Sequence, residues 1–193
     1  MPLLSAIAAS PRYLTLTLVV LSAAILAAAL TFEHAWGYAP CHLCLQQREP
    51  WWGLIGLGLV LLYLPFLWAR VPGRVLIGIF ALGFALAIYN VYLGSYHAGI
   101  EWKWWPGPPS CTGTGAALMP NGTDLLSGVR PILCDEAAWR DPVLKLSMAG
   151  YNALASLAAA AIAALGGWRL FQMARVMSLL LPGLRQLSKG TKP

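Results

Sequence analysis

The sequence predicts an all-α membrane protein, a four-transmembrane-helix bundle with two long loops on one side of the bilayer. Of its 193 residues 59% are hydrophobic and only 10% are charged, against about 25% in a soluble domain. Four uncharged runs cover residues 13–32, 51–69, 75–100 and 146–168. Each is long enough to cross a bilayer as a helix, the form that satisfies backbone amides in lipid. A soluble protein with these runs would keep almost no polar surface.

The first run, residues 13–32, ends in an Ala-rich stretch, as a cleaved signal peptide also does. The apolar part of a signal peptide is only about 7–15 residues long, so we expect a retained helix. The second run, residues 51–69, directly follows Pro50. The second span is therefore either kinked or begins later than the preceding motif suggests.

The turn between the second and third spans, residues 70–74, is short and contains Pro-Gly, so these two helices form an antiparallel pair. The third span, residues 75–95, carries Gly83 and Ala87 at helical spacing. Small residues let membrane helices approach closely, and we expect tight packing along this face.

The fourth span, residues 146–168, is rich in Ala, and a basic amphipathic tail, residues 169–193, follows it. This tail is expected along the inner leaflet. Asn90 and Asn152 are polar groups at membrane depth, where we expect a hydrogen bond between helices. The chain is interpreted as one membrane domain over residues 1–193.

Charge placement indicates the orientation of the spans. Eight of the 13 basic residues share a side with both termini: Arg12, Arg70, Arg74, Arg169, Arg175, Arg185, Lys189 and Lys192. All seven acids lie on the other side. Basic residues near span ends mark the cytoplasm, so the loops 33–50 and 96–145 are expected outside. The net charge of +6 reflects topology, and no groove-binding motif supports binding of nucleic acid.

All four cysteines fall in the two outer loops, where disulfides form and persist. Cys41 and Cys44 have the Cys-X-X-Cys spacing of redox-active pairs, in which one thiol has a lowered pKa. If the second helix begins near Cys44, its N-terminal amides favour a thiolate there. Cys111 and Cys134 close a longer loop rich in Pro and Gly, which is suited to meeting a protein partner.

Three other uses of these cysteines can be weighed. Zinc binding prefers two close ligand pairs or nearby histidines, which the wide spacing of Cys111 and Cys134 does not offer. Haem attachment needs a histidine after the motif, where Leu45 stands. Two structural disulfides are the serious alternative, although a Cys41–Cys44 ring closes almost no chain and is a poor staple.

The run Pro40-Cys-His-Leu-Cys-Leu-Gln-Gln-Arg48 resembles the signature of the bacterial DsbB family of disulfide bond formation proteins. Tyr96-His-Ala-Gly99, followed by Glu101-Trp102, is similar to one branch of that family. The resemblance covers almost the whole chain. It implies an inner-membrane enzyme with two periplasmic loops, which reoxidises a periplasmic thioredoxin-like dithiol oxidase (DsbA-like). The electrons would pass to a membrane quinone, ubiquinone or menaquinone.

The resemblance also implies roles for the cysteines. Cys111 would form the mixed disulfide with the partner, and Cys134 would then exchange with Cys41. Cys44 would be the thiolate that faces the quinone ring.

Arg48 matches the family's quinone-site arginine, and His97 lies near the position of a quinone-site histidine. One helical turn beyond Cys44, a fixed cation at Arg48 would favour both a thiolate and a developing quinone anion. Snorkelling to the headgroups is the alternative for Arg48, and a hydrogen-bonded interfacial position is the alternative for His97.

Two rival functions remain at this point. Enzymes of the vitamin K epoxide reductase type have four helices and similar thiol chemistry, but in them the loop pair precedes the quinone-side Cys-X-X-Cys. A small membrane scaffold or transporter with structural disulfides is the other rival. Such a protein needs charged residues inside its spans or a partner surface, and these spans carry no charge.

Overall fold

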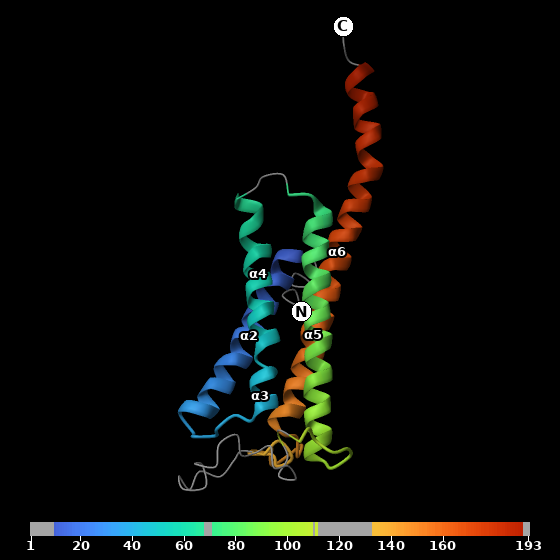
Figure 1. The fold of residues 1–193 in the computed structure, drawn as a ribbon. Coiled ribbons are helices and arrows are strands. Elements are labelled where there is room, and N and C mark those ends of the chain that lie inside the picture. The colour runs from blue at the N-terminus through green and yellow to red at the C-terminus, as the bar shows by residue number, and fades with distance from the viewer. Residues whose placement is uncertain (1–9, 68–70, 110, 112–132, 191–193) are drawn as a thin grey trace.

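The computed structural model describes residues 10–67, 71–109, 111 and 133–190. Within them the chain forms five helices and no strand (Figure 1): α2 (Pro11–His34), α3 (His42–Gln46), α4 (Glu49–Leu67), α5 (Gly73–Glu101) and α6 (Met148–Gly190). The predicted all-α class is therefore confirmed for this part of the chain. Residues 112–132 of the predicted second loop, and both chain ends, lie outside the described residues.

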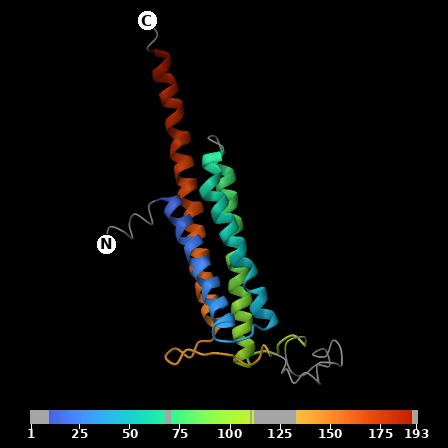
Figure 2. The same cartoon turned by 90° about the vertical axis from the view of Figure 1, so that its left-hand side faces the viewer.

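Three of the described helices are long and apolar enough to cross a membrane, namely α2, α5 and the part of α6 over Met148–Leu179. Helix α6 packs against both α5 and α2, and all three run along the length of the bundle in both views (Figures 1 and 2), as the spans of a helical membrane protein do. Helix α4 packs against both α2 and α5. A fourth span at residues 51–69 stays a prediction.

The tightest helix contact joins α5 to α6. A Cβ placed on Gly94 would lie 2.8 Å from the backbone nitrogen of Ala153. Ala87, Ala159 and Ala163 are buried in the same core. Of the two small residues expected to pack closely, Ala87 is fully buried in this core. A Cβ placed on Gly83 would lie 3.6 Å from the Leu54 side chain of α4, which is an ordinary contact distance.

A polar link crosses the core beside the first turn of α4. The side-chain amides of Asn152 of α6 and Asn90 of α5 lie 3.3 Å apart, as expected for polar residues that hydrogen-bond between helices. Trp51 of α4 donates from its indole nitrogen to the Asn152 oxygen at 2.7 Å. The link therefore fixes three helices relative to one another where unpaired polar groups would be costly.

Several element boundaries differ from the sequence expectation. Helix α5 continues past the expected end at residue 95 because no helix breaker intervenes before Pro106 and its last turn is buried. Helix α4 begins at Glu49, so Pro50 lies in the first turn, where its missing N–H costs nothing. Residues 169–190 extend α6 in the same direction in Figures 1 and 2, rather than turning to lie along a leaflet.

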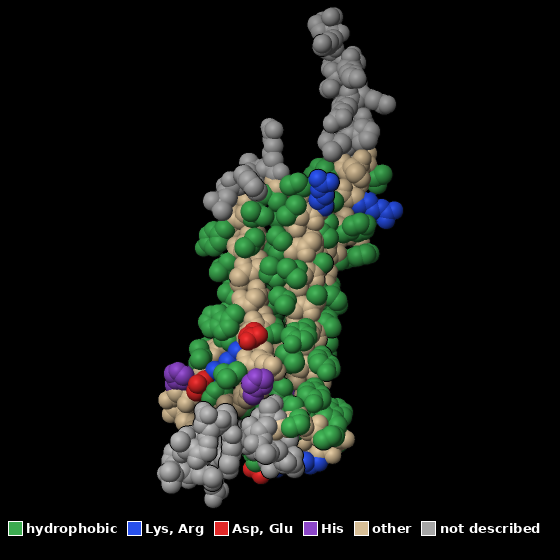
Figure 3. Space-filling view, viewed as in Figure 1, with side chains coloured by type: hydrophobic (Ala, Val, Ile, Leu, Met, Phe, Trp, Pro, Cys, Tyr) green, Lys and Arg blue, Asp and Glu red, His purple; other side chains and the backbone are tan. Residues whose placement is uncertain are grey.

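The surface divides into an apolar middle and polar ends. On the face shown in Figure 3, hydrophobic side chains cover the middle of the bundle. The acidic and histidine side chains visible on this face gather near the end that carries α3, and Lys or Arg side chains lie near both ends. This is the distribution of a bundle embedded in lipid.

Candidate dithiol–disulfide site

The first cysteine pair belongs to the short helix α3. Cys41 is the N-cap residue, and its Sγ accepts a hydrogen bond from the Cys44 backbone N–H at 3.2 Å. Both thiols are free, with Cys41 buried and Cys44 partly exposed. The sequence argument assigned the helix-terminal amides to Cys44. Because α3 begins at His42, the amide contact goes to Cys41 instead.

This geometry makes the two thiols unequal. The pKa of Cys41 is lowered to about 4, chiefly because the Cys44 side chain hydrogen-bonds to it, with a further contribution from His97. The same contact raises the pKa of Cys44, since its proton is held by the Cys41 thiolate. In the reduced pair, therefore, Cys41 is the thiolate.

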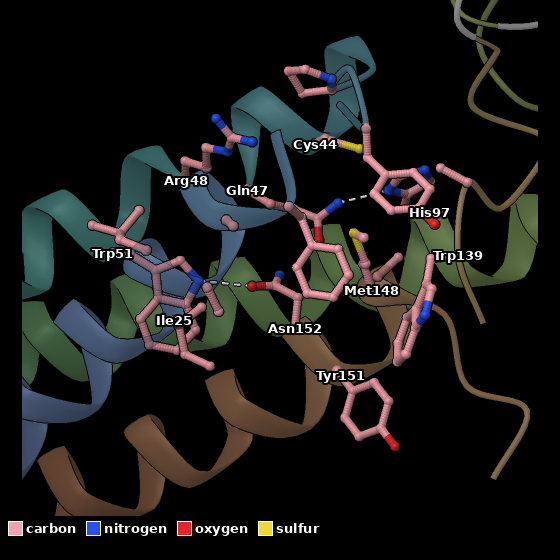
Figure 4. Close-up of a pocket in the computed structure, with 18 of the residues that line it drawn as sticks. Ile25, Cys44, Gln47, Arg48, Trp51, His97, Trp139, Met148, Tyr151 and Asn152 are labelled. Atoms are coloured by element: carbon pink, nitrogen blue, oxygen red, sulfur yellow. Dashed lines mark hydrogen bonds between the residues drawn. The ribbon is translucent and has the colours of Figure 1, made fainter. Parts of the chain in front are cut away.

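His97 reaches Cys41 from the last turns of α5. Its Nε2 lies 3.7 Å from Cys41 Sγ and 3.7 Å from Glu101 Oε1. Its Nδ1 lies 2.8 Å from the side-chain nitrogen of Gln47 (Figure 4). His97, Gln47 and Glu101 are all buried. The structure thus brings the predicted His97 to the dithiol together with two residues that the sequence analysis did not select.

The second cysteine pair, Cys111 and Cys134, forms a disulfide in which both residues are buried. The Cys134 N–H donates to the Cys111 carbonyl at 2.7 Å. Beside it, the Lys103 ammonium donates to Asp135 Oδ2 at 2.8 Å and to the Asp135 carbonyl at 2.9 Å. These contacts hold the disulfide against the end of α5.

The two pairs meet at Cys41. The sulfurs of Cys41, Cys111 and Cys134 all lie within 4.8 Å of one another. The sulfurs of Cys41 and Cys44 and a ring nitrogen of His97 also lie within 4.8 Å of one another. Cys41 belongs to both groups, and thiol–disulfide exchange between the pairs needs only a small movement of sulfur.

An apolar cavity of about 430 Å³ opens beside Cys44 (Figure 4). Its walls are mostly aliphatic and aromatic side chains from α2, α4 and α6 and the neighbouring loops, including Phe32, Tyr38, Trp51, Trp139 and Tyr151. Cys44, Arg48 and His97 supply the reactive and polar groups. Such a mixture suits an apolar ring with polar oxygen atoms.

Arg48 lies in the break between α3 and α4, so it is not on one continuous helix with Cys44, as the sequence argument assumed. Both residues nevertheless line the cavity. The Arg48 guanidinium is 17% exposed and pairs with the carboxylate of Glu33 at the end of α2. The pair holds the cation at the cavity wall, which simple snorkelling to headgroups would not require.

The site thus packs a free dithiol against a disulfide, with one thiol facing an apolar cavity, which is the arrangement that thiol–disulfide exchange in a membrane protein requires. The family model of the disulfide bond formation protein DsbB matches residues 11–166, and the chain belongs to the DsbB family.

A relative supports this assignment. The disulfide bond formation protein B of Stutzerimonas stutzeri (strain A1501) is 42% identical over 95 residues, which are 47% of this chain and 56% of the relative. The chain thus spans about half the length of the curated relative that it matches. No solved structure matches the chain.

Proposed function

We propose that this protein reoxidises a periplasmic thioredoxin-like dithiol oxidase (DsbA-like) and passes the two electrons to a membrane quinone. One observation carries the proposal: Cys41 lies within 4.8 Å of both sulfurs of the Cys111–Cys134 disulfide, while its neighbour Cys44 lines the apolar cavity. This arrangement suits a relay from a protein-facing pair to a cavity-facing pair.

The exchange steps follow from thiol chemistry. A partner thiolate attacks Cys111, the Cys111–Cys134 bond breaks, and Cys134 leaves as a thiolate. The second partner thiol then releases Cys111. With the other pair oxidised, Cys134 attacks Cys41, a Cys41–Cys134 disulfide forms, and Cys44 leaves as a thiolate. Cys111 then attacks Cys134, which re-forms the Cys111–Cys134 disulfide and releases Cys41 as a thiolate. Each step breaks one S–S bond and forms another, so the two electrons end on the Cys41–Cys44 pair.

The acidity of Cys44 depends on the state of Cys41. Its pKa is raised chiefly by the hydrogen bond with Cys41 and by burial. Once Cys41 is held in a disulfide, the first cause is gone. Cys44 therefore becomes the cavity-facing thiolate only after the exchange, which reconciles the implied role of Cys44 with the acidity of Cys41 in the reduced pair.

The cavity fits a quinone head group, ubiquinone or menaquinone, by size and by the chemistry of its walls. Arg48 would hold a ring oxygen there and His97 would form part of the cavity wall beside the ring, with Cys44 facing the ring. A bound quinone would supply an acceptor for two electrons and two protons. The guanidinium of Arg48 stays charged and favours negative charge at the Cys44 end of the cavity.

The distribution of charge supports the proposed topology. Four spans, with α4 as the second, would place both termini in the cytoplasm and all four cysteines in the periplasm, where the partner and an oxidising environment are found. The protein then belongs to the bacterial inner membrane.

The experiment is to add a reduced thioredoxin-like dithiol oxidase to the purified protein with quinone and to follow quinone reduction together with partner thiol oxidation. We expect one quinol for each partner disulfide formed, and loss of both in Cys41→Ser. Partner oxidation without quinol formation would overturn the assignment of the acceptor. The absence of both in the wild-type protein would overturn the relay.

A further inference from the structure

Gln47 has no part in the exchange steps, yet it is buried and tied to His97. Its side-chain nitrogen donates to the Leu43 carbonyl at 3.2 Å and lies 2.8 Å from His97 Nδ1. A carbonyl oxygen only accepts hydrogen bonds, so Leu43 fixes the amide with its nitrogen toward both groups. The amide nitrogen also only donates. His97 Nδ1 is therefore an acceptor and carries no proton.

The proton of the neutral ring then lies on Nε2. The groups around this side of the ring are acceptors, with Cys41 Sγ and Glu101 Oε1 both at 3.7 Å from Nε2. A second proton on Nδ1 would point at the Gln47 nitrogen and break that contact. The surroundings thus favour one neutral tautomer, whose single N–H lies on the side of the ring that faces Cys41 and Glu101.

Glu101 is a buried carboxyl group with an open hydrogen-bonding position. Its side chain is 5% exposed and receives a hydrogen bond from Ser147. Among the described residues, its Oε2 has no hydrogen-bond partner. Together with Cys41 and Cys44 it lines a small cavity of about 40 Å³, which has room for one bridging water.

Several ionisable side chains surround this cavity. Glu136 also lines it, and Arg140 donates to the Glu101 carbonyl at 3.2 Å. A Cys41 thiolate and a Glu101 carboxylate together would place two negative charges beside one N–H donor. Like charges this close do not both ionise readily. One of the two groups therefore holds a proton.

We propose that Gln47 is a positioning residue that keeps His97 neutral with its proton on Nε2, and that Glu101 takes the proton that Cys41 releases. In this step the Cys41 S–H bond breaks, its electron pair stays on Sγ, and the proton passes to a Glu101 oxygen. The His97 N–H turns from Glu101 to the new thiolate. The site carries one negative charge before and after. The inference rests on the proposed function, in which the dithiol gives up its protons.

The tautomer is tested by nitrogen NMR of the reduced protein with labelled histidine, with the His97 signals assigned from His97→Gln. We expect Nε2 protonated and Nδ1 unprotonated. In Gln47→Glu, where a carboxylate faces Nδ1, we expect both nitrogens protonated. The neighbouring Gln46→Leu should leave the signals unchanged. A protonated Nδ1 in the wild-type protein, or no change in Gln47→Glu, would overturn the role of Gln47.

The proton acceptor is tested by the pH profile of Cys41 alkylation in a Cys44→Ser background, in which Cys44 does not titrate. Two coupled groups that share a proton give two steps, and a lone thiol gives one. We expect two steps in this background, one step in Glu101→Gln, and two steps again in Glu136→Gln. Gln47→Leu should move the Cys41 step upward by about one pH unit, because the thiolate loses an oriented donor.

One step in the background, or two steps in Glu101→Gln, would overturn the role of Glu101, and a single step in Glu136→Gln would transfer that role to Glu136. These measurements use no quinone and no partner. A failed tautomer or titration result with intact quinone reduction rejects this inference alone. The absence of quinone reduction in the wild-type protein rejects the proposed function.

Discussion

The backbone N–H of Cys44 donates a hydrogen bond to Cys41 Sγ at 3.2 Å, so the first thiol of the motif caps the helix that carries the second. This contact also makes the pKa values of the two thiols differ. Cys41, the sulfur nearest the loop disulfide, is stabilised as a thiolate, and Cys44 is kept protonated until Cys41 is bonded elsewhere.

The lowered pKa of Cys41 predicts the pH range in which it reacts. Since that pKa is about 4, the thiolate persists from neutral pH downward and is lost only as the pH falls through this value. Cys44→Ala removes the largest cause and should move the alkylation profile of Cys41 to higher pH. Mass spectrometry of the alkylated protein measures this. The exposed neighbour His42→Ala serves as the control, and equal shifts in both variants would contradict the assignment.

The two cysteine pairs are predicted to be separable. Cys111→Ser or Cys134→Ser should block oxidation of the protein partner, because the partner-facing disulfide is lost. Quinone should still oxidise Cys41 and Cys44, which line or adjoin the cavity. Thiol counting after incubation with quinone alone, and then with reduced partner, checks both halves. Wild-type partner oxidation by Cys111→Ser would show that the relay is wrong.

Substitution of Arg48 tests most directly whether the cavity beside Cys44 is the quinone site. Removing a preorganised donor of this kind typically costs roughly 10²–10³ in rate, and we expect the lower end because the guanidinium is 17% exposed. Arg48→Ala should therefore weaken quinone reduction strongly while leaving exchange between the partner and Cys111–Cys134 intact. Arg48→Lys should recover only part, since a point charge replaces a planar fork.

The measurement for Arg48 varies quinone at a fixed excess of reduced partner. Glu33→Gln is a useful companion, because it keeps the shape of the neighbouring side chain but removes its charge. If Arg48→Ala kept turnover and apparent quinone affinity within about twofold of wild type, the acceptor site would have to lie elsewhere.

The contact between α5 and α6 predicts a stability effect far from the thiols. Gly94→Ala places a Cβ 2.8 Å from the backbone of Ala153, where neither helix can give way cheaply. Overpacking of this kind typically costs about 1–3 kcal/mol. The thermal unfolding temperature in detergent should fall. Gly78→Ala, on the same helix with open space around the added carbon, should change it little.

The proposed topology predicts one-sided labelling. A membrane-impermeant thiol reagent, added to reduced cells with a permeabilised outer membrane, should reach the loop cysteines without lysis. The reason is the placement of all seven acids and only five basic residues on that side of the four predicted spans. Labelling that appears only after lysis would reverse the orientation.

Much of the helical architecture is predictable because it depends on local composition. Charge-free runs locate the long helices, and polar residues at membrane depth, such as Asn90 and Asn152, indicate hydrogen bonding between helices, although not with which partner. The approach of the cysteine pairs needed the resemblance to a family, since nothing local to Cys41 says how close Cys134 lies.

The roles of the remaining site residues depend on contacts between segments that lie far apart in the sequence. The pair between Arg48 and Glu33 joins two different helices, and no spacing rule connects them. Glu101 falls in the predicted second loop because its charge ends the uncharged run at residue 100. In the structure, however, helix α5 continues through Glu101. Gln47 lies inside the recognised motif, but its importance depends on where α5 presents His97.

The break between α3 and α4 divides the site into two independently adjustable parts. One part contains Cys41, which is fixed by α3 and by His97. The other contains Arg48, which is fixed by Glu33 of α2. Under the proposed function, substitutions along α2 can therefore change the position of the Arg48 guanidinium relative to the quinone, while Cys41 and its contacts stay the same. Evolution within such a scaffold can change the electron acceptor while it conserves the exchange reaction.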